Sequence, residues 1–171
     1  KDGLSATAFP SGVRNTPVEI NETVAPIIVW RKEYRTDSGG PGRHRGGTGQ
    51  IMEIGHAEDA PFAVSSMFDR LKFPARGRGG GAQGRRGRVR LGSGGELDGK
   101  GRQTIPAGDR LVLEMPGGGG LGDPLARPPE DVARDVRDGL VSPKAARDDY
   151  GVVVHADGSF EEMEAREKPV P

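Results

Sequence analysis

Residues 37–50 read DSGGPGRHRGGTGQ, and the fold of this chain depends on what glycine-rich stretches of this kind do. The stretch holds six glycines, three basic side chains and one proline, and it offers no large apolar side chain to a core. Composition leaves three interpretations open: a phosphate-binding loop, an RNA-binding Arg-Gly segment, or an elaborate connection between strands. Its position between two apolar runs favours the connection, in which glycine supplies backbone freedom.

Two further glycine-rich stretches leave similar alternatives open. In ARGRGGGAQGRRGRVR (75–90), arginines spaced by glycines resemble RNA-binding segments, but no aromatic residue is interleaved, and a long solvated loop is the simpler explanation. In MPGGGGLGDP (115–124), consecutive N–H groups could wrap an anion, but the Gly-Lys-Ser/Thr end of a P-loop is missing. Close passage of the backbone over another surface, or positive φ angles, explains these four glycines better.

The composition is that of a folded domain with an unusual amount of glycine. The chain has 171 residues, 33% of them hydrophobic, with 29 glycines and 14 prolines, which approaches the composition of disordered chains. The net charge is zero and the apolar residues form organised runs, so one folded domain is expected. Charge is nevertheless segregated: ten Lys and Arg accompany two acids between residues 70 and 102, and acids outnumber bases after residue 109. The two halves should attract different partners, or each other.

The sequence has no cysteine, which excludes disulfides, thiolate metal sites and a cysteine nucleophile. Every apolar run is far shorter than the ~20 residues of a membrane span, and KDGLSATAFPSG lacks the apolar core of a signal peptide. These features indicate a soluble, cytoplasmic protein. The chain begins with lysine, which suggests a fragment, a processed piece or a naturally split subunit.

Apolar runs around the glycine-rich stretches predict strands. The run PVEINETVAPIIVWRKEY (17–34) is rich in β-branched and aromatic residues, and Pro26 interrupts it, which predicts two strands or one broken edge strand. Alternation in RVRLG and RLVLEM is typical of half-buried strands. We therefore predict a mainly β domain over residues 1–123, sandwich- or barrel-like, with five to seven short strands and long glycine-rich loops. The remaining strand candidates are 49–57, 62–69, 87–93 and 109–116.

After residue 123 the pattern changes to that of two short α-helices, so the fold class is α+β overall. One helix begins at Pro-Pro-Glu-Asp and places Val132, Val136 and Leu140 on one face. Ser142 caps the second, with Pro143 at its first position. Helices this short must dock on something larger, so 124–150 is predicted to be an appendage packed on the β domain. Residues 151–160 are predicted to form a terminal strand and turn, and 161–171 a flexible tail.

No catalytic constellation can be recognised, so catalytic residues are unknown. His44, His56 and His155 lack metal-binding spacing, and no metal site is predicted. Within FPSGVRNTPVE (9–19), Arg14, Asn15, Thr16 and Glu19 could converge on a ligand or could simply stabilise a turn. If residues of this chain touch a substrate or a phosphate, the polar clusters at turns point to Arg14, Asn15, Arg43 and Arg45, whose cations would stabilise anionic charge.

Four segments in order carry a resemblance to a known family: FPSGVRNTPVE, DSGGPGRHRGGTG, MFDRLKFPARGRGGG and MPGGGGLGDPLARPPEDVARDVRDGLVSPKAARDDYGVVV. Together they resemble the C-terminal portion of hydantoinase B subunits, a family that includes 5-oxoprolinase and subunits of acetone and acetophenone carboxylases. The resemblance spans roughly residues 4–154. It implies that the chain is part of a larger enzyme and is inactive alone.

The resemblance also implies a reaction and partners. A hydantoinase A-type ATPase subunit phosphorylates the oxygen of a stable carbonyl compound, and the B-type subunit completes the reaction. This implies ATP-dependent hydrolytic opening of a cyclic amide of the hydantoin or 5-oxoproline class, or alternatively a carboxylation of the acetone or acetophenone type. The implied partners are the N-terminal region of the B-type subunit and the A-type subunit, with no membrane; an RGG-like RNA-binding module is a further, less favoured alternative.

The same resemblance bears on cofactors. ATP and a divalent metal are implied for the whole complex, but the family's metal-binding acids and histidines lie in an earlier region, so no cofactor is predicted to bind this chain. Its expected role is mainly structural: to close the B-type subunit and to form an interface.

Overall fold

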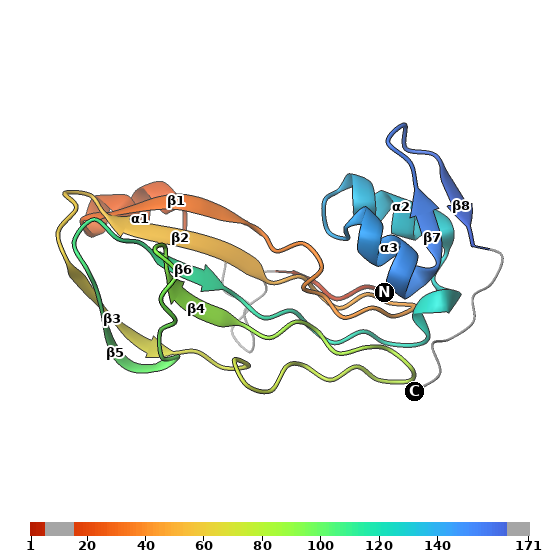
Figure 1. The fold of residues 1–171 in the computed structure, drawn as a ribbon, viewed down its shortest axis with the longest axis horizontal. Helices are drawn as coiled ribbons and strands as arrows, with labels where there is room; N and C mark the ends of the chain where they lie inside the picture. Colours follow the sequence, from red (N-terminus) through yellow and green to blue (C-terminus); the bar gives the residue numbers. More distant parts are fainter. Residues whose placement is uncertain (6–15, 164–171) are drawn as a thin grey trace.

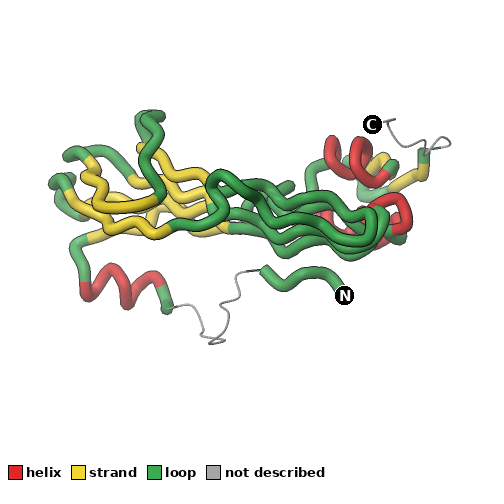
Figure 2. The backbone as a smooth tube through the Cα atoms, turned by 90° about the horizontal axis from the view of Figure 1, so that it is seen from below, coloured by secondary structure: helices red, strands yellow, loops and turns green. Residues whose placement is uncertain are grey.

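The computed structural model describes residues 1–5 and 16–163. The molecule is elongated: its strands gather at one end, its C-terminal helices lie at the other, and extended glycine-rich segments run between them (Figures 1 and 2). The predicted α+β class with mainly β character is confirmed. The sheets of the described residues remain small and open and form no closed barrel, so the barrel alternative is not realised.

The larger sheet contains β1 (Ile27–Tyr34), β2 (Gln50–His56), β6 (Leu111–Glu114) and β4 (Arg88–Leu91), in that spatial order. All three strand pairs are antiparallel. A second, two-stranded sheet pairs β3 (Phe62–Met67) with β5 (Lys100–Ile105). A buried cluster of Val89, Ile105, Leu111 and Leu113 holds the two sheets together, because it draws residues from both of them.

Two strand predictions require correction. The segment Val18–Val24 forms helix α1 and not a strand, although it is rich in β-branched residues. Local hydrogen bonds account for this: the Thr23 hydroxyl donates to the Glu19 carbonyl at 2.7 Å, and Pro26 isolates the segment from β1. Strand β5 was not predicted, because its sequence KGRQTI has one fully buried apolar residue, Ile105, and a glycine with φ of +89°.

The three glycine-rich stretches lie side by side through the middle of the molecule, and we call residues 38–49, 75–87 and 116–122 the glycine bundle (Figure 2). Backbone groups join all three segments. Gly118 accepts from the Gly40 N–H at 2.8 Å, and Gly120 accepts from Arg78 and donates to Ala82, both at 2.9 Å. The prediction that residues 37–50 connect two strands is confirmed, since they link β1 to β2.

Close packing of the bundle leaves no room for a side chain at several of its glycines. A Cβ added to Gly117 would lie 1.8 Å from the Ser38 carbonyl oxygen, and one added to Gly120 would lie 2.0 Å from that of Pro41. Glycine is required for the same reason at the axis of collagen, where backbones approach too closely for any side chain. The prediction that the glycines of 115–124 allow close backbone passage is confirmed.

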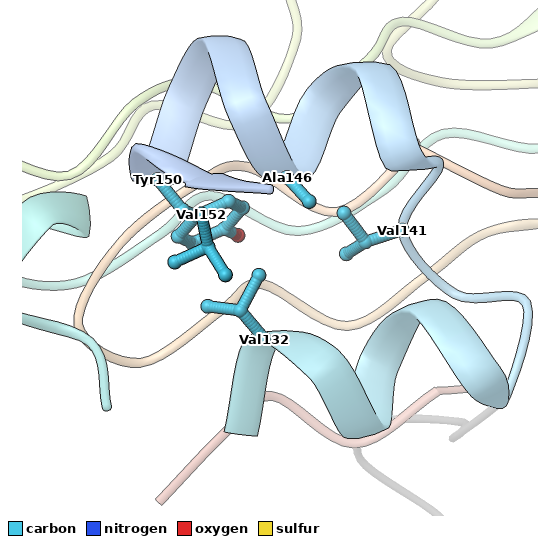
Figure 3. Close-up of a cluster of buried hydrophobic side chains, with 5 residues drawn as sticks. All are labelled: Val132, Val141, Ala146, Tyr150 and Val152. Carbon is cyan, nitrogen blue, oxygen red and sulfur yellow. The ribbon is translucent and has the colours of Figure 1, made fainter. Parts of the chain in front are cut away.

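The C-terminal unit contains η1 (Pro124–Ala126), α2 (Pro129–Arg137), α3 (Pro143–Tyr150), β7 (Val152–Val154) and β8 (Phe160–Glu162). As predicted, the Ser142 hydroxyl caps α3 by accepting from the Ala145 N–H at 3.1 Å. Apolar side chains of α2, α3, β7 and the loop between the two helices meet in a buried cluster of Val132, Val141, Ala146, Tyr150 and Val152 (Figure 3). Strand β8 pairs with β7, so the predicted terminal strand is a hairpin that extends into the predicted tail.

Candidate functional site

The structure separates the predicted ligand-contacting residues. Arg14 and Asn15 lie outside the described residues. Arg43 is exposed in the glycine bundle, where its backbone N–H donates to the Gly122 carbonyl at 3.2 Å. Arg45, two residues later, is 5% exposed and turns inward. Arg45 is engaged by contacts within the chain. Ligand contact by Arg43 or Arg45 stays a prediction.

Arg45 belongs to a buried ion-pair cluster with Asp2, Arg127 and Asp135. Its Nε donates to Asp135 Oδ2 at 3.0 Å, and its Nη1 donates to the Gly46 carbonyl at 2.8 Å. Arg127 donates to both Asp2 oxygens, at 2.7 and 2.8 Å, and to Asp135 Oδ2 at 2.8 Å. The cluster therefore ties the first residues, the glycine bundle and helix α2 to one another.

The charges of the ion-pair cluster stabilise one another. Burial alone would raise the pKa of Asp2, but the hydrogen bond and charge of Arg127, followed by the Arg45 backbone N–H and charge, hold it below its ordinary value. Burial acts to lower the pKa of Arg127, and the Asp2 hydrogen bond and the charges of Asp135 and Asp2 outweigh it and raise the pKa. Asp2 and Arg127 therefore stay charged at neutral pH, which suits a structural ion pair.

Two polar atoms in or next to the cluster are buried and have no hydrogen-bond partner among the described residues. They are Arg127 Nε and Tyr150 Oη. Burial raises the pKa of the Tyr150 hydroxyl above its ordinary range, and the positive charges of Arg127 and Arg45 oppose this shift. The hydroxyl is therefore protonated at neutral pH. It is 2% exposed and packs in the apolar cluster of the C-terminal unit, so it is not placed to act on a substrate.

The histidines are far apart in space as well as in sequence. His44 bridges to Leu121 in the glycine bundle, His56 Nδ1 accepts from the Glu58 N–H at 3.1 Å, and His155 lies 3.7 Å from Glu161. Across residues 1–5 and 16–163, no three His, Asp or Glu side chains gather in a way that could hold a metal ion. The described part of the chain also has no helix that is long and apolar enough to cross a bilayer.

One concave surface of the described structure is a mainly apolar groove of about 620 Å³. It is lined by Val89 and Leu113 from the sheet, by Met115, and by the glycine bundle at 46–49 and 118–119. Residues 67–71 also line it, and they include the charged Asp69 and Arg70. At its rim, Met67 is 83% exposed and Leu4 is 66% exposed. Exposed apolar side chains around a hollow are typical of a surface that another protein segment covers.

Sequence reasoning missed the partners of Arg45 and also missed the groove. Asp135 lies 90 residues from Arg45 in the chain, and no local pattern connects the two. One signal was available: Asp135 is three residues after Val132 and precedes Val136, so a carboxylate sits on the apolar face of a predicted helix. A charge in that position requires a buried partner. The groove has no such signal, because distant segments build it.

Comparison with known proteins identifies the family. The model of the Hydantoinase B/oxoprolinase family matches residues 1–124. The chain is 36% identical over 153 residues to caprolactamase subunit beta of Pseudomonas jessenii, an alignment that covers 85% of this chain and 26% of that subunit. The chain therefore belongs to the hydantoinase B/oxoprolinase family, as its sequence motifs suggested, and it spans about a quarter of the length of this relative.

Two solved structures share the fold. The ATP-dependent caprolactamase of Pseudomonas jessenii matches with a TM-score of 0.72 and 28% identity, over 92% of this chain and 31% of that chain. An acetone carboxylase in its nucleotide-free state matches with a TM-score of 0.70 and 26% identity, over 96% of this chain and 27% of that chain. The elongated arrangement of sheets, glycine bundle and helices is thus one part of a much larger subunit in both enzymes.

Proposed function

We propose that this chain is the C-terminal portion of a B-type subunit in an enzyme that opens a cyclic amide at the cost of ATP. In such a reaction the ring C–N bond breaks and a water oxygen joins the carbonyl carbon, so that one open-chain product carries both the new carboxylate and the released nitrogen. ATP and a second water give ADP and phosphate. The observation that carries the proposal is the 36% identity to a caprolactamase subunit over 85% of the chain. The name of that relative denotes a cyclic amide substrate.

Within this enzyme the chain has a structural and interface role. The apolar groove supports it: the hollow is open, its rim exposes Met67 and Leu4, and the chain spans only about a quarter of a relative's length. We place the preceding region of the B-type subunit in this groove. The A-type ATPase subunit is the second partner of the proposal, and ATP and a divalent metal bind to parts of the complex outside this chain. The same proposal places the enzyme in the cytoplasm, where ATP is formed and used.

A carboxylase of the acetone or acetophenone type is the second candidate, favoured by the fold match to acetone carboxylase at a TM-score of 0.70. An RNA-binding role for residues 75–90 has weaker support, because the glycines that would keep such a segment free are committed to packing. A Cβ at Gly77 or Gly81 would lie 2.1 or 2.3 Å from a backbone oxygen. These glycines hold a fixed conformation instead of a flexible one.

The test is to purify the native complex through an affinity tag on this chain and to identify its other chains by mass spectrometry. The complex is then assayed for ATP hydrolysis coupled to the loss of hydantoin, 5-oxoproline or caprolactam, and separately with acetone or acetophenone plus bicarbonate. We expect coupling to a cyclic amide. Coupling to a ketone would establish the carboxylase candidate, and recovery of the chain without an A-type ATPase would contradict both.

A variant pair tests the role of the groove in the same preparation. Met67→Asp places a charge at the rim of the groove, so we expect it to reduce recovery of the other B-type region. Val24→Asp makes the same kind of change at a residue of α1 that is 78% exposed and does not line the groove. Equal recovery with the two variants would show that the groove is not the interface.

A further inference from the structure

A second hollow, of about 580 Å³, is lined by cations from three parts of the chain. Arg35 follows β1, Lys72 belongs to the loop after β3, and Arg85 and Arg86 lie in the glycine bundle. No carboxylate is among the residues that line this hollow in the described structure. We call it the cationic hollow. It does not overlap the apolar groove, and neither the family match nor the proposed cyclic amide chemistry explains it.

Two of the four cations are held in place by backbone carbonyls. Arg35 Nη1 donates to the Arg86 carbonyl at 2.8 Å and to the Met115 carbonyl at 3.2 Å. Arg85 Nε donates to the Asp37 carbonyl at 3.1 Å. A carbonyl oxygen fixes the direction of a guanidinium group without neutralising its charge. These two groups are therefore oriented before a ligand arrives, which lowers the entropy lost on binding.

The positive charge of the hollow is only partly compensated. Arg35 pairs with Glu114 at 3.1 Å, but Glu114 is shared with Arg90, at 3.4 Å. Among the described residues, Lys72 and Arg86 form no ion pair with a carboxylate, whereas Arg85 also lines a neighbouring hollow with Asp37 and Asp149, and its charge acts to lower the pKa of Asp149. Burial lowers the pKa of Arg35; Glu114 opposes this, and the positive charges of Arg85 and Arg88 lower it further. An anion in the hollow would relieve this repulsion.

We propose that the cationic hollow binds the phosphate groups of a small molecule that carries a diphosphate. Four cations and no carboxylate line this concave site, which suits the negative charge of a diphosphate, and planar guanidinium groups suit bidentate contact with phosphate oxygens. The volume falls within the usual range of small-molecule sites, roughly 300–1,000 Å³.

The experiment is a calorimetric titration of the full chain with inorganic pyrophosphate at several salt concentrations. Pyrophosphate should bind, and added salt should weaken the binding, because exposed charges are screened. Lys72→Glu and Arg86→Glu should each raise the Kd by about tenfold or more. Arg102→Glu is the matched control: Arg102 is exposed in β5, does not line the hollow and should leave the Kd nearly unchanged.

Further titrations identify the kind of molecule that carries the diphosphate, and conservative variants show whether a loss of binding comes from misfolding. If ADP and pyrophosphate bind equally, the hollow recognises phosphate alone; if ADP binds more tightly, the ligand is a nucleotide. Lys72→Met and Arg86→Gln, checked for folding by circular dichroism, should weaken binding in the same direction as the charge reversals. Absent pyrophosphate binding, or equal losses with Arg86→Glu and the Arg102→Glu control, would overturn the proposal.

Discussion

Gly117 shows why this structure requires glycine at particular positions. Its Cα faces the Ser38 carbonyl, and its N–H donates to the Arg85 carbonyl at 3.0 Å. The Arg85 N–H in turn donates to Ser38, at 2.8 Å. Gly117 thus lies where all three segments of the glycine bundle meet, and a methyl group there has no free space.

Gly117→Ala should destabilise the chain by about 3 kcal/mol, because overpacking against a backbone cannot be relieved by moving a side chain. For a chain of this size this corresponds to a fall in Tm of roughly 6–12 °C. Thermal unfolding followed by circular dichroism measures it. Gly95→Ala is the control, since a Cβ there would meet only the side chain of Leu91, whose Cδ1 would lie 3.4 Å away. Similar Tm values for the two variants would refute close packing in the bundle.

Asp135→Asn should cost about 3–5 kcal/mol of unfolding free energy, because it leaves Arg45 and Arg127 buried with less compensating charge. Asp131→Asn, in the same helix, breaks a surface pair with Arg134 and should cost less than about 1 kcal/mol. Denaturant unfolding of both variants gives the comparison. If Asp135→Asn lowered the unfolding free energy no more than Asp131→Asn, the ion-pair cluster would not stabilise the fold.

Acid should weaken the ion-pair cluster at Asp2. The pKa of Asp2 is lower in the folded chain than its ordinary value of 3.8, so the unfolded chain binds more protons in acid. The stabilisation is fully present above that value and is lost as the pH falls below it, through the folded-state pKa. Unfolding free energies of Asp2→Asn and the parent chain should therefore differ at pH 7 and converge in acid. A difference that is independent of pH would contradict this account.

At the residue scale, the sequence shows which charged side chains are present but not which of them are buried. Arg43 and Arg45 flank the same histidine and look equivalent in the sequence, yet Arg43 is exposed and Arg45 is buried, with 5% of its surface exposed. The difference arises from Asp135 and Asp2, which only the folded chain brings near. The burial of Arg127, which is 2% exposed, could not be predicted from the sequence, because its carboxylate partners Asp135 and Asp2 are 8 and 125 residues away.

The elements that could be predicted are those with local signals at their ends. Helix α3 has Ser142 at its N-cap, Pro143 at its first position and Gly151 in the left-handed conformation at its C-cap, all of which can be read from sequence. Helix α1 lacks such a signal, since Pro17 makes no side-chain cap and no residue of the helix is buried. Composition alone therefore misassigned it.

The Ser142 cap should contribute about 1 kcal/mol to stability, since its hydroxyl satisfies the free Ala145 N–H. Ser142→Ala should lose this contribution, whereas Ser142→Thr keeps the hydroxyl and should lose only a few tenths of a kcal/mol. Chemical denaturation of the two variants measures the difference. Equal stability of Ala and Thr at this position would mean that the Ser142 backbone contact with Asp37 Oδ1, at 2.7 Å, fixes the helix start by itself.

At the scale of the whole molecule, two separate apolar clusters are joined by a connection that has no apolar core. One cluster lies between the sheets and the other within the C-terminal unit. The glycine bundle between them is held by backbone hydrogen bonds, such as the 2.9 Å bond from the Gly120 N–H to the Ala82 carbonyl. Just before the bundle, the Asp37 N–H donates to the Leu140 carbonyl at 3.0 Å and so reaches the C-terminal unit. Composition could not predict this, because glycine-rich stretches with few apolar residues are usually disordered.

Hydrogen exchange should reveal this order. Backbone amides of Gly40, Gly118 and Gly120 donate within the bundle, so peptides that cover them should exchange slowly, at rates comparable with those of β2 and β6. The exposed residues Lys72 and Phe73, whose backbone N–H groups donate to no group among the described residues, serve as the fast-exchanging reference. Mass spectrometry after deuterium labelling measures both. Complete exchange of the bundle within the dead time would show that its hydrogen bonds do not persist in solution.

The glycine bundle also changes how this domain can diverge. Connecting segments ordinarily absorb insertions and deletions, because their length is not tied to their neighbours. In the bundle each segment hydrogen-bonds to another at successive positions, so removal of one residue from 116–122 would shift its pairing with both neighbours at once. The segments that look most like spacers therefore have the least freedom in length, and new sequence can enter more readily at the hairpin turn around Gly158 or at the open turn around Gly94.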